Sequence, residues 1–153
     1  MAVRASAARG GEPGVSVHHG DIELRTTRRE ETHDVTARVA SIVDGSGIRD
    51  GACLVAVAHT TVGIFVNENA DPDVQRDLLV ALSRLLPDQG DYRHAEGNSP
   101  AHAKAVLVGN SVTLPVRDGR LALGTWQGIF VAEFDGPRNR RASVTVFGEA
   151  RLD

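Results

Sequence analysis

The sequence predicts an α+β fold in which mainly antiparallel strands are combined with about three helices. Strand-like runs and helical stretches follow one another without the strict β-α alternation that is typical of parallel sheets. The second half of the chain contains a strong hairpin signal, Asp118-Gly119, between two strand-like runs. The chain has 153 residues, of which 41% are hydrophobic and 24% charged, and this composition suits one globular domain with its own core.

The N-terminal region predicts a tail and then a strand. Residues 1–16 are small, contain glycine and lack periodic apolar positions, so we expect a flexible tail before a single domain over residues 17–153. His18 and His19 follow, and neighbours on a strand point to opposite faces, so we expect a solvated pair. The alternation of polar and apolar residues over 21–26 then predicts a half-buried strand.

The next elements are one helix and two buried strands. Apolar residues at helical spacing, with Gly45-Ser46-Gly47 as a stop, predict an amphipathic helix over residues 33–44. The continuous apolar run 52–58 predicts a buried strand. Residues 62–66 predict a second one, separated from the first by the polar sequence His59-Thr60-Thr61.

Two further helices have clear start signals. Asp71-Pro72 is an N-cap followed by a proline at the first helical position, and an apolar stripe continues from there to Pro87. Asn98 or Ser99 with Pro100 repeats this signal and predicts a short helix that ends near Gly109. His102 falls in the first turn of that helix, where free backbone N–H groups favour an anion.

The remainder predicts antiparallel strands. Residues 112–116 and 120–123 flank the hairpin turn, and 130–134 and 142–147 add two strands around Gly136-Pro137.

Composition argues against two classes of partner and favours one compartment. The formal net charge of −3 and a pI near 6.1 predict no nucleic-acid partner, and no basic block predicts membrane binding. No run is long enough to span a membrane, and the first residues lack the apolar core of a secretory signal. The single cysteine, Cys53, lies in an apolar run and reads as a buried thiol rather than a nucleophile. We therefore expect a cytoplasmic protein.

The segment Tyr92 to Lys104 has the composition of an active site. It places His94 and His102 with a carboxylate, an amide and a lysine around a glycine, which exceeds what a connecting loop needs. His59 ends a strand, and three imidazoles with an open position would make a hydrolytic or Lewis-acid metal site. The alternative for His59 is a satisfied core residue.

Two carboxylates are candidate catalytic groups. Glu68 follows a buried strand and could act as a ligand or a base at a pocket rim, whereas Asp71 is sufficiently explained as an N-cap. Glu96 lies two residues from His94 and could orient its second ring nitrogen. A solvated position in a loop is the alternative for Glu96.

The C-terminal third adds candidate substrate contacts. Trp126 and Gln127 lie between two glycines and suit a substrate wall, although a packed indole is equally compatible with the sequence. Arg138, Arg140 and Arg141 could bind a phosphate or carboxylate, with a solvated turn as the alternative. We interpret Asp135, which precedes Gly136-Pro137, as a turn residue in the first place and as a functional group only in the second.

Taken together, these motifs resemble the YjbQ-like family over about residues 17–150. The resemblance is carried by the order and spacing of five segments: His59-Thr60-Thr61, Asn67 to Pro72, Tyr92 to His102, Gly124 to Gln127 and Glu133 to Arg138. It implies a compact α+β subunit with β-sandwich-like sheets, which assembles as a homotrimer with sites near subunit boundaries. It also implies a secondary thiamine-phosphate synthase activity, in a family whose principal role is unsettled, and metal ligands at His59, His94 and His102.

These inferences lead to specific assignments. We expect a small phosphorylated substrate, with Glu68, Glu96 and His94 as catalytic groups. The residues that we expect to bind substrate are Asn98, Trp126, Gln127, Thr60 and Arg138. A three-histidine site favours zinc or another transition metal, whereas magnesium, the usual partner of diphosphates, prefers oxygen ligands. Two alternatives stay open: a metal-dependent hydrolase of a small phosphorylated compound, and a non-catalytic phosphate- or small-molecule-binding trimer.

Overall fold

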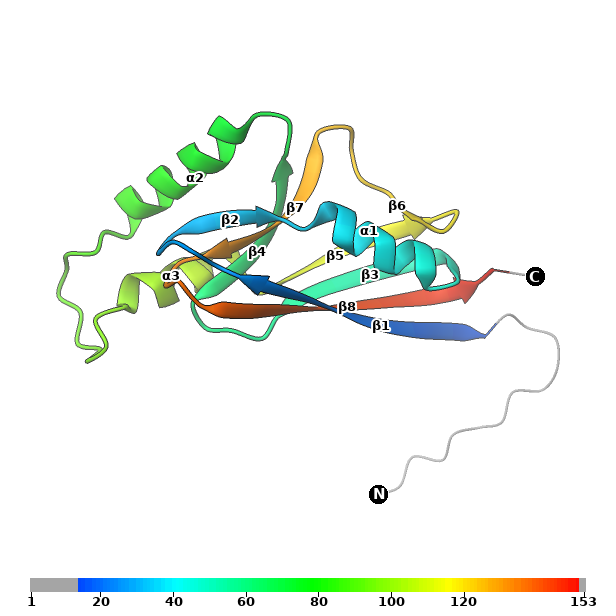
Figure 1. Ribbon diagram of the computed structural model, residues 1–153, viewed down its shortest axis with the longest axis horizontal. Coiled ribbons are helices and arrows are strands. Elements are labelled where there is room, and N and C mark those ends of the chain that lie inside the picture. The colour runs from blue at the N-terminus through cyan, green and yellow to red at the C-terminus, as the bar shows by residue number, and fades with distance from the viewer. Residues whose placement is uncertain (1–13, 152–153) are drawn as a thin grey trace, which may run out of the picture.

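Two antiparallel sheets and three helices make up the fold in the computed structural model, which describes residues 14–151 (Figure 1). The strands are β1 (Val15–Arg25), β2 (Glu31–Asp34), β3 (Ile48–Val57), β4 (Val62–Glu68), β5 (Ser111–Arg117), β6 (Arg120–Leu121), β7 (Gln127–Glu133) and β8 (Asn139–Ala150). The helices are α1 (Thr36–Gly45), α2 (Pro72–Leu85) and α3 (Ser99–Val108). One sheet has the order β1-β8-β3-β5-β6 and the other β2-β7-β4. The predicted α+β class is confirmed.

The two sheets share one apolar core, which explains the sandwich-like arrangement. Buried side chains of the large sheet, such as Val55 and Val144, belong to the same cluster as Ile64 and Val131 of the small sheet. Helix α1 contributes Val39 to the same core. Burial of this continuous apolar surface is the main stabilising term for the fold.

Strand β7 of the small sheet is buried on both faces, because its side chains alternate between two apolar clusters. Ile129 and Val131 face the large sheet, whereas Ala132 and the following Phe134 face a second cluster with α3 and part of α2. Phe130 stacks on Phe65 of β4 with ring centroids 5.6 Å apart. Strand β7 therefore connects the core to the helical layer that carries the candidate site.

Several strands are longer than their apolar pattern predicts. Strand β1 begins at Val15 and pairs with β8 along its whole length, from Val15↔Glu149 to Arg25↔Asn139. Of the predicted tail, residues 1–13 lie outside the described part of the chain, and Val15 and Ser16 belong to β1. Most side chains in this first half of β1 are exposed, so the apolar pattern carries no strand signal there.

The predicted helix over residues 33–44 begins later than expected. Residues Glu31–Asp34 form the short strand β2, which pairs with β7, and α1 starts at Thr36. The Asp34 carboxylate accepts hydrogen bonds from the backbone N–H and the hydroxyl of Thr36 and so marks the change from strand to helix. The earlier start was wrong because pairing with a distant strand leaves no local periodic signal.

The start signals of α2 and of the hairpin are confirmed. Asp71 caps α2 by accepting a hydrogen bond from the Asp73 backbone N–H at 2.9 Å, with Pro72 at the first position. Asp118 and Gly119 have φ angles of 50° and 76°, the left-handed pair that a tight hairpin requires. In the described range 14–151, no helix is both long enough and apolar enough to cross a membrane.

Helix α2 packs only lightly on the rest of the chain. Gln75 is its one buried residue, and Leu79 and Leu82 reach the second cluster. Leu85 is 65% exposed, and the neighbouring α3 leaves Val106 84% exposed. These two helices thus present apolar side chains to solvent at one end of the molecule.

Candidate functional site

A buried ion pair lies at the base of the candidate site. Arg140, at the start of β8, donates from Nη2 and Nε to the two carboxylate oxygens of Glu133 at the end of β7. The Glu133 side chain is fully buried and that of Arg140 is 7% exposed. Arg140 Nη2 also donates to the hydroxyl of Thr61 at 2.7 Å, and the Thr26 hydroxyl donates to Glu133. The pair therefore ties both sheets together at this end of the molecule.

The same network controls the charge of Glu133. Burial alone raises the pKa of the Glu133 carboxyl, but hydrogen bonds from Arg140, the Asp135 backbone N–H and Thr26 outweigh it, so the pKa lies below its ordinary value. Glu133 is therefore a fixed anion at neutral pH, held by a fixed cation.

Asn98 and Arg138 both contact a second carboxylate, Asp135. Asn98 Nδ2 donates to Asp135 Oδ2 at 2.9 Å, and Arg138 Nη2 donates to the same oxygen at 2.9 Å. Burial acts to raise the pKa of Asp135, and the bonds from Asn98 and Arg138 lower it further than burial raises it. Asn98 and Arg138, the two predicted phosphate contacts, are thus bonded to the Asp135 carboxylate. A phosphate would have to compete with this carboxylate for them.

His59 is held in one tautomer next to this network. The Arg141 backbone N–H donates to His59 Nε2 at 2.9 Å, so Nε2 accepts and the proton of a neutral ring is on Nδ1. Burial and the nearby Arg140 charge lower the pKa of His59. Among residues 14–151, His59 Nδ1 has no hydrogen-bond partner, so the ring presents one N–H donor.

Two pockets adjoin His59. One, which we call the His59 pocket, has a volume of about 540 Å³ and is lined by His59, Glu23, Leu24, Asn139 and three arginines, Arg25, Arg140 and Arg141. The other, of about 490 Å³, brings His59 and Thr60 together with His102 of α3. The predicted residues Thr60 and His102 therefore share a pocket with His59.

His94 and His102 lie next to each other, as the sequence predicts for the 92–104 segment. Their rings meet edge to face with centroids 5.4 Å apart. Both line an apolar groove between the end of α2 and α3, of about 920 Å³, together with Tyr92, Val106 and Leu107 among others. We call this the α3 groove.

The three histidines do not form a ready three-ligand metal site within one chain. In the described part, no group of three or more His, Cys, Asp or Glu side chains converges in the way that a metal ion needs. His94 and His102 are a usable pair, but the Nε2 lone pair of His59 already accepts the Arg141 N–H. The residues present fit a metal only in part.

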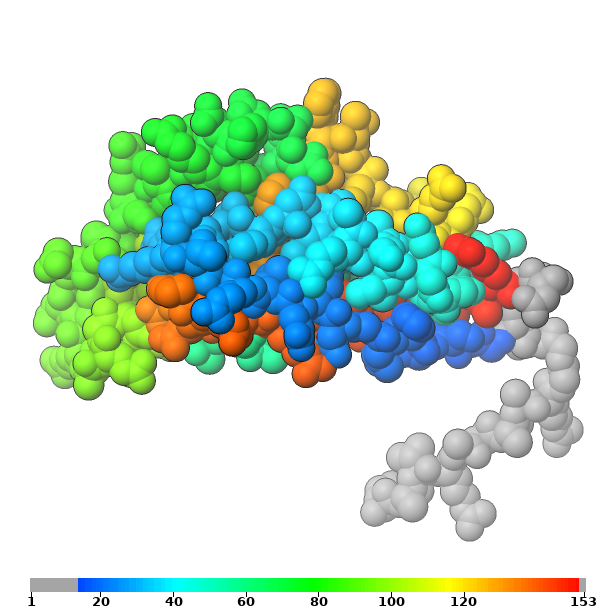
Figure 2. Space-filling view, viewed as in Figure 1, coloured from blue at the N-terminus to red at the C-terminus, as the bar shows by residue number. Residues whose placement is uncertain are grey.

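The predicted site residues Glu68, Trp126 and Gln127 lie together, but far from His59. Glu68 pairs with Gln127 at the far end of β4, and the Asn69 backbone N–H donates to the Trp126 carbonyl. Seven residues of strand place these groups roughly 20 Å from the His59 end of β4. Trp126 is 64% exposed, on the β6–β7 connection that projects from the surface in Figure 2. A small substrate cannot contact both groups of one chain.

Glu96 makes no hydrogen bond to the His94 ring. It is exposed in the loop before α3 and, in the range 14–151, makes no side-chain hydrogen bond or ion pair. Cys53 is fully buried, and burial raises the pKa of its thiol to about 11, in keeping with the predicted inert thiol.

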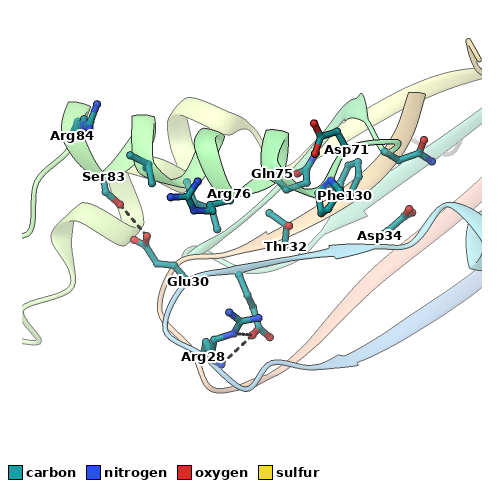
Figure 3. A pocket seen from close by; sticks show the side chains of 15 residues that line it. Arg28, Glu30, Thr32, Asp34, Asp71, Gln75, Arg76, Ser83, Arg84 and Phe130 are labelled. Atoms are coloured by element: carbon teal, nitrogen blue, oxygen red, sulfur yellow. Dashed lines mark hydrogen bonds and ion pairs between the residues drawn. The ribbon is translucent and has the colours of Figure 1, made fainter. Parts of the chain in front are cut away.

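A third polar group, absent from the sequence-based assignments, joins α2 and α3. Lys104 of α3 is 1% exposed and forms an ion pair with Glu30, and it also donates to the hydroxyl of Ser83 at 3.1 Å. Ser83 in turn donates to Glu30. Glu30 and Ser83 line one end of a cleft of about 820 Å³ between α2 and β2, which we call the α2 cleft (Figure 3).

Sequence reasoning missed these buried polar roles, although one signal was present. Arg140 is in phase with Ala142, Val144 and Val146, which are the buried positions of β8. A charged residue in phase with a buried stripe indicates a buried ion pair, so Arg140 could have been separated from the solvated Arg141. The partnership of Lys104 with Glu30 has no comparable local signal.

The fold and this site define a class: an α+β protein of two antiparallel sheets, with a polar site held by a buried Glu–Arg pair beside histidines. The chain belongs to the UPF0047 YjbQ-like family, whose pattern it matches over residues 20–149.

The relatives agree along nearly their whole length. UPF0047 protein MJ1081 of Methanocaldococcus jannaschii is 48% identical over 83% of this chain and 92% of its own. UPF0047 protein YugU of Bacillus subtilis is 45% identical over 83% of this chain and 97% of its own length. A crystal structure from Sulfolobus solfataricus, described as a YbjQ-like protein of unknown function, superposes with a TM-score of 0.86 at 37% identity, covering 89% of this chain and all of that one. A crystal structure from Clostridium acetobutylicum superposes with a TM-score of 0.81 at 50% identity, and the match covers 82% of this chain and 98% of that one.

Proposed function

We propose that this protein is a transferase acting on small phosphorylated substrates, with thiamine-phosphate synthase-like activity. The observation that carries the proposal is the His59 pocket, in which a neutral imidazole with a fixed Nδ1–H lies beside three arginines. Such a group of donors suits a diphosphate, whose charge rises as it leaves. Membership of the YjbQ-like family, in which this activity is expected, supports the same choice.

The proposed reaction joins two substrates through a new carbon–nitrogen bond. The ring nitrogen of a thiazole phosphate attacks the methylene carbon of a pyrimidine methyl diphosphate, so a C–N bond forms while the C–O bond breaks. The electron pair of the C–O bond leaves with the pyrophosphate. Because the nucleophile is the ring nitrogen itself, the protein need not remove a proton from it. Stabilisation of the departing pyrophosphate is therefore the main task of the site.

The residues of the His59 pocket divide this task. His59 Nδ1–H donates to a pyrophosphate oxygen, because the Arg141 backbone N–H occupies Nε2 and leaves the proton of the neutral ring on Nδ1. Arg25 and Arg141 supply positive charge at the surface, where Arg141 exchanges its exposed partner Asp21 for the ligand. Arg140 remains bound to Glu133 and contributes its field without moving.

We propose that a homotrimer completes the site. Leu85, Val106 and Leu107 are 65%, 84% and 56% exposed around the α3 groove, and this apolar surface suits contact with another copy. In a trimer, the Glu68, Trp126 and Gln127 group of one copy can approach the histidines of a neighbour, which a single chain does not allow. Light scattering should give three times the monomer mass, and Val106→Glu should reduce that mass, whereas the exposed-site control Val15→Glu should not.

A metal remains part of the proposal at His94 and His102. These two imidazoles would bind zinc or another transition metal, with His59 as third ligand only if it releases the Arg141 N–H. A bound metal would supply Lewis acidity, and magnesium would arrive with the diphosphate. Metal content of the untagged protein, measured by mass spectrometry for the wild type and His94→Ala, tests this part separately.

The adjacent His94–His102 pair also favours a second candidate, a metal-dependent hydrolase of a small phosphorylated compound. One experiment separates the candidates: the protein is incubated with the pyrimidine diphosphate, with and without the thiazole phosphate. Thiamine phosphate and pyrophosphate that appear only with both substrates support the synthase. Phosphate released from one substrate after zinc loading supports the hydrolase. Saturable binding without turnover overturns both and leaves a small-molecule-binding trimer.

A further inference from the structure

The α2 cleft contains a buried hydrogen-bond acceptor without a partner. Gln75, in the first turns of α2, is 8% exposed and lines the cleft. Its Oε1 atom is buried and has no hydrogen-bond partner among residues 14–151. Figure 3 shows the side chain reaching from α2 toward Asp71 and Phe130. An unpaired buried acceptor raises the free energy of the folded chain, and a ligand N–H or O–H that reaches it removes this cost.

The orientation of the Gln75 amide is fixed. Gln75 Nε2 donates to the Glu68 carbonyl oxygen at 2.9 Å, so the amide nitrogen is already used within the chain. The oxygen can therefore only accept, and because neighbouring atoms cover it, a ligand reaches it when the side chains around it shift. A ligand that binds at this atom must bring a donor, which a carboxylate such as benzoate does not have.

Two carboxylates that line the same cleft can also accept from a ligand donor, although both of these residues, unlike Gln75, are exposed. Asp34 and Asp71 each use Oδ1 to accept from the backbone N–H of Thr36 and Asp73, respectively. Their Oδ2 atoms make no hydrogen bond within the described residues, and both side chains line the cleft. Leu79 and Phe130 supply apolar contact beside them. This part of the lining thus combines acceptors with an apolar wall. Three arginines, Arg28, Arg76 and Arg84, also line the cleft, of which Arg28 is paired with Glu31 and Arg76 with Asp77.

We propose that the α2 cleft binds a small ring compound bearing an amine or amidine group. Its N–H donors bond to Gln75 Oε1 and to the carboxylates of Asp34 and Asp71, and the flat ring lies along Leu79. A volume of about 820 Å³ accommodates such a molecule. The cleft shares no lining residue with the His59 pocket, so this proposal stands independently of the transferase activity.

Benzamidine and benzoate are matched probes for this cleft. The two have the same ring and shape, but benzamidine presents only N–H donors and benzoate only acceptors. Titration of the ¹⁵N-labelled full chain should give chemical-shift changes at the Gln75 side-chain amide and the first turn of α2 with benzamidine. Benzoate should bind at least about tenfold more weakly. Equal binding of both probes, no binding of benzamidine, or shifts confined to residues around His59 would overturn the proposal.

Variants test the role of Gln75 directly. Gln75→Met keeps the length of the side chain and should weaken benzamidine binding about tenfold, whereas the exposed control Gln89→Met should leave it unchanged. Because Gln75→Met also removes the bond to Glu68, a second variant, Thr32→Lys, adds a cation to the cleft from strand β2 and leaves residue 75 as glutamine. It should also weaken benzamidine binding. Wild-type affinity in both folded variants would contradict the proposal.

Discussion

Arg140 and Glu133 form a two-point ion pair, with Nε and Nη2 of the arginine each 2.7 Å from a different carboxylate oxygen. The pair joins the end of β7 to the start of β8, and both side chains are almost completely removed from solvent. Its planar geometry is the one in which a guanidinium binds a carboxylate most strongly. His59, Asp135 and Asn98 are all arranged around it.

Removal of the Glu133 charge should destabilise the chain strongly. Glu133→Gln keeps the shape but leaves the buried Arg140 without its counter-charge, so we expect a loss of about 3–5 kcal/mol in the free energy of unfolding. Urea denaturation measures it. Arg141→Gln, which breaks the exposed pair with Asp21, is the control and should change stability little. A Glu133→Gln chain as stable as this control would contradict the structural role of the pair.

Acid should destabilise the protein through the buried carboxylates. The pKa of Glu133 lies below its ordinary value of 4.5, so its contribution to stability is complete above pH 4.5 and is lost as the pH falls through the folded-state pKa. Glu31 and Asp135, whose pKa values are also lowered, act in the same direction. Unfolding free energies measured from pH 7 downward should therefore decline below about pH 4.5.

The double variant Glu133→Met/Arg140→Met isolates the contribution of the pair to this decline. It replaces both charges with apolar side chains, which is often close to neutral for stability. Its unfolding free energy should fall less steeply with acid than that of the wild type. Parallel curves for the two proteins would show that Glu133 is not the source of the pH dependence.

His59 should be a neutral ring with its proton on Nδ1. Burial and the Arg140 charge lower its pKa below the ordinary value of 6.5, and the Arg141 N–H occupies Nε2. Long-range ¹H–¹⁵N correlation spectra report the tautomer, and a pH titration of the same signals reports the midpoint. A proton on Nε2, or a midpoint above 6.5, would contradict the assignment of the Nδ1–H as the ligand donor.

Lys104 should stabilise the contact between α2 and α3. Lys104→Met leaves Glu30 without its cation and should cost about 3 kcal/mol in the free energy of unfolding. Adding Glu30→Gln removes the unpaired charge and should restore part of the loss, which a double-mutant cycle measures. If the two substitutions were additive, the ion pair would have no energetic role.

Local signals account for much of the predicted fold. The Asp71-Pro72 start of α2 and the Asp118-Gly119 turn depend on backbone conformations that a few neighbouring residues determine, and both are confirmed. Strand β2 was missed because its four residues are strand only through pairing with β7, a hundred residues away in the sequence.

The candidate site was predictable only where its residues are close in sequence. His94 and His102 are neighbours in space because one loop and one helical turn connect them. The separation of Glu68 and Trp126 from His59 depends on the sheet register, which pairs Glu68 with Gln127 at the far end of β4. Register depends on long-range packing, which leaves no local signal in the sequence. The sequence-based prediction therefore placed both groups in one site.

The central claim, that the His59 pocket stabilises a departing pyrophosphate, is tested most directly by pyrophosphate release. The rate is measured with both substrates present for the wild type, for His59→Gln and for His19→Gln, an exposed histidine on β1 as the matched control. We predict pyrophosphate and thiamine phosphate in equal amounts from the wild type and the His19→Gln variant, with a rate at least about a hundredfold lower for His59→Gln. Equal rates for all three proteins, or no pyrophosphate from the wild type, would contradict the claim.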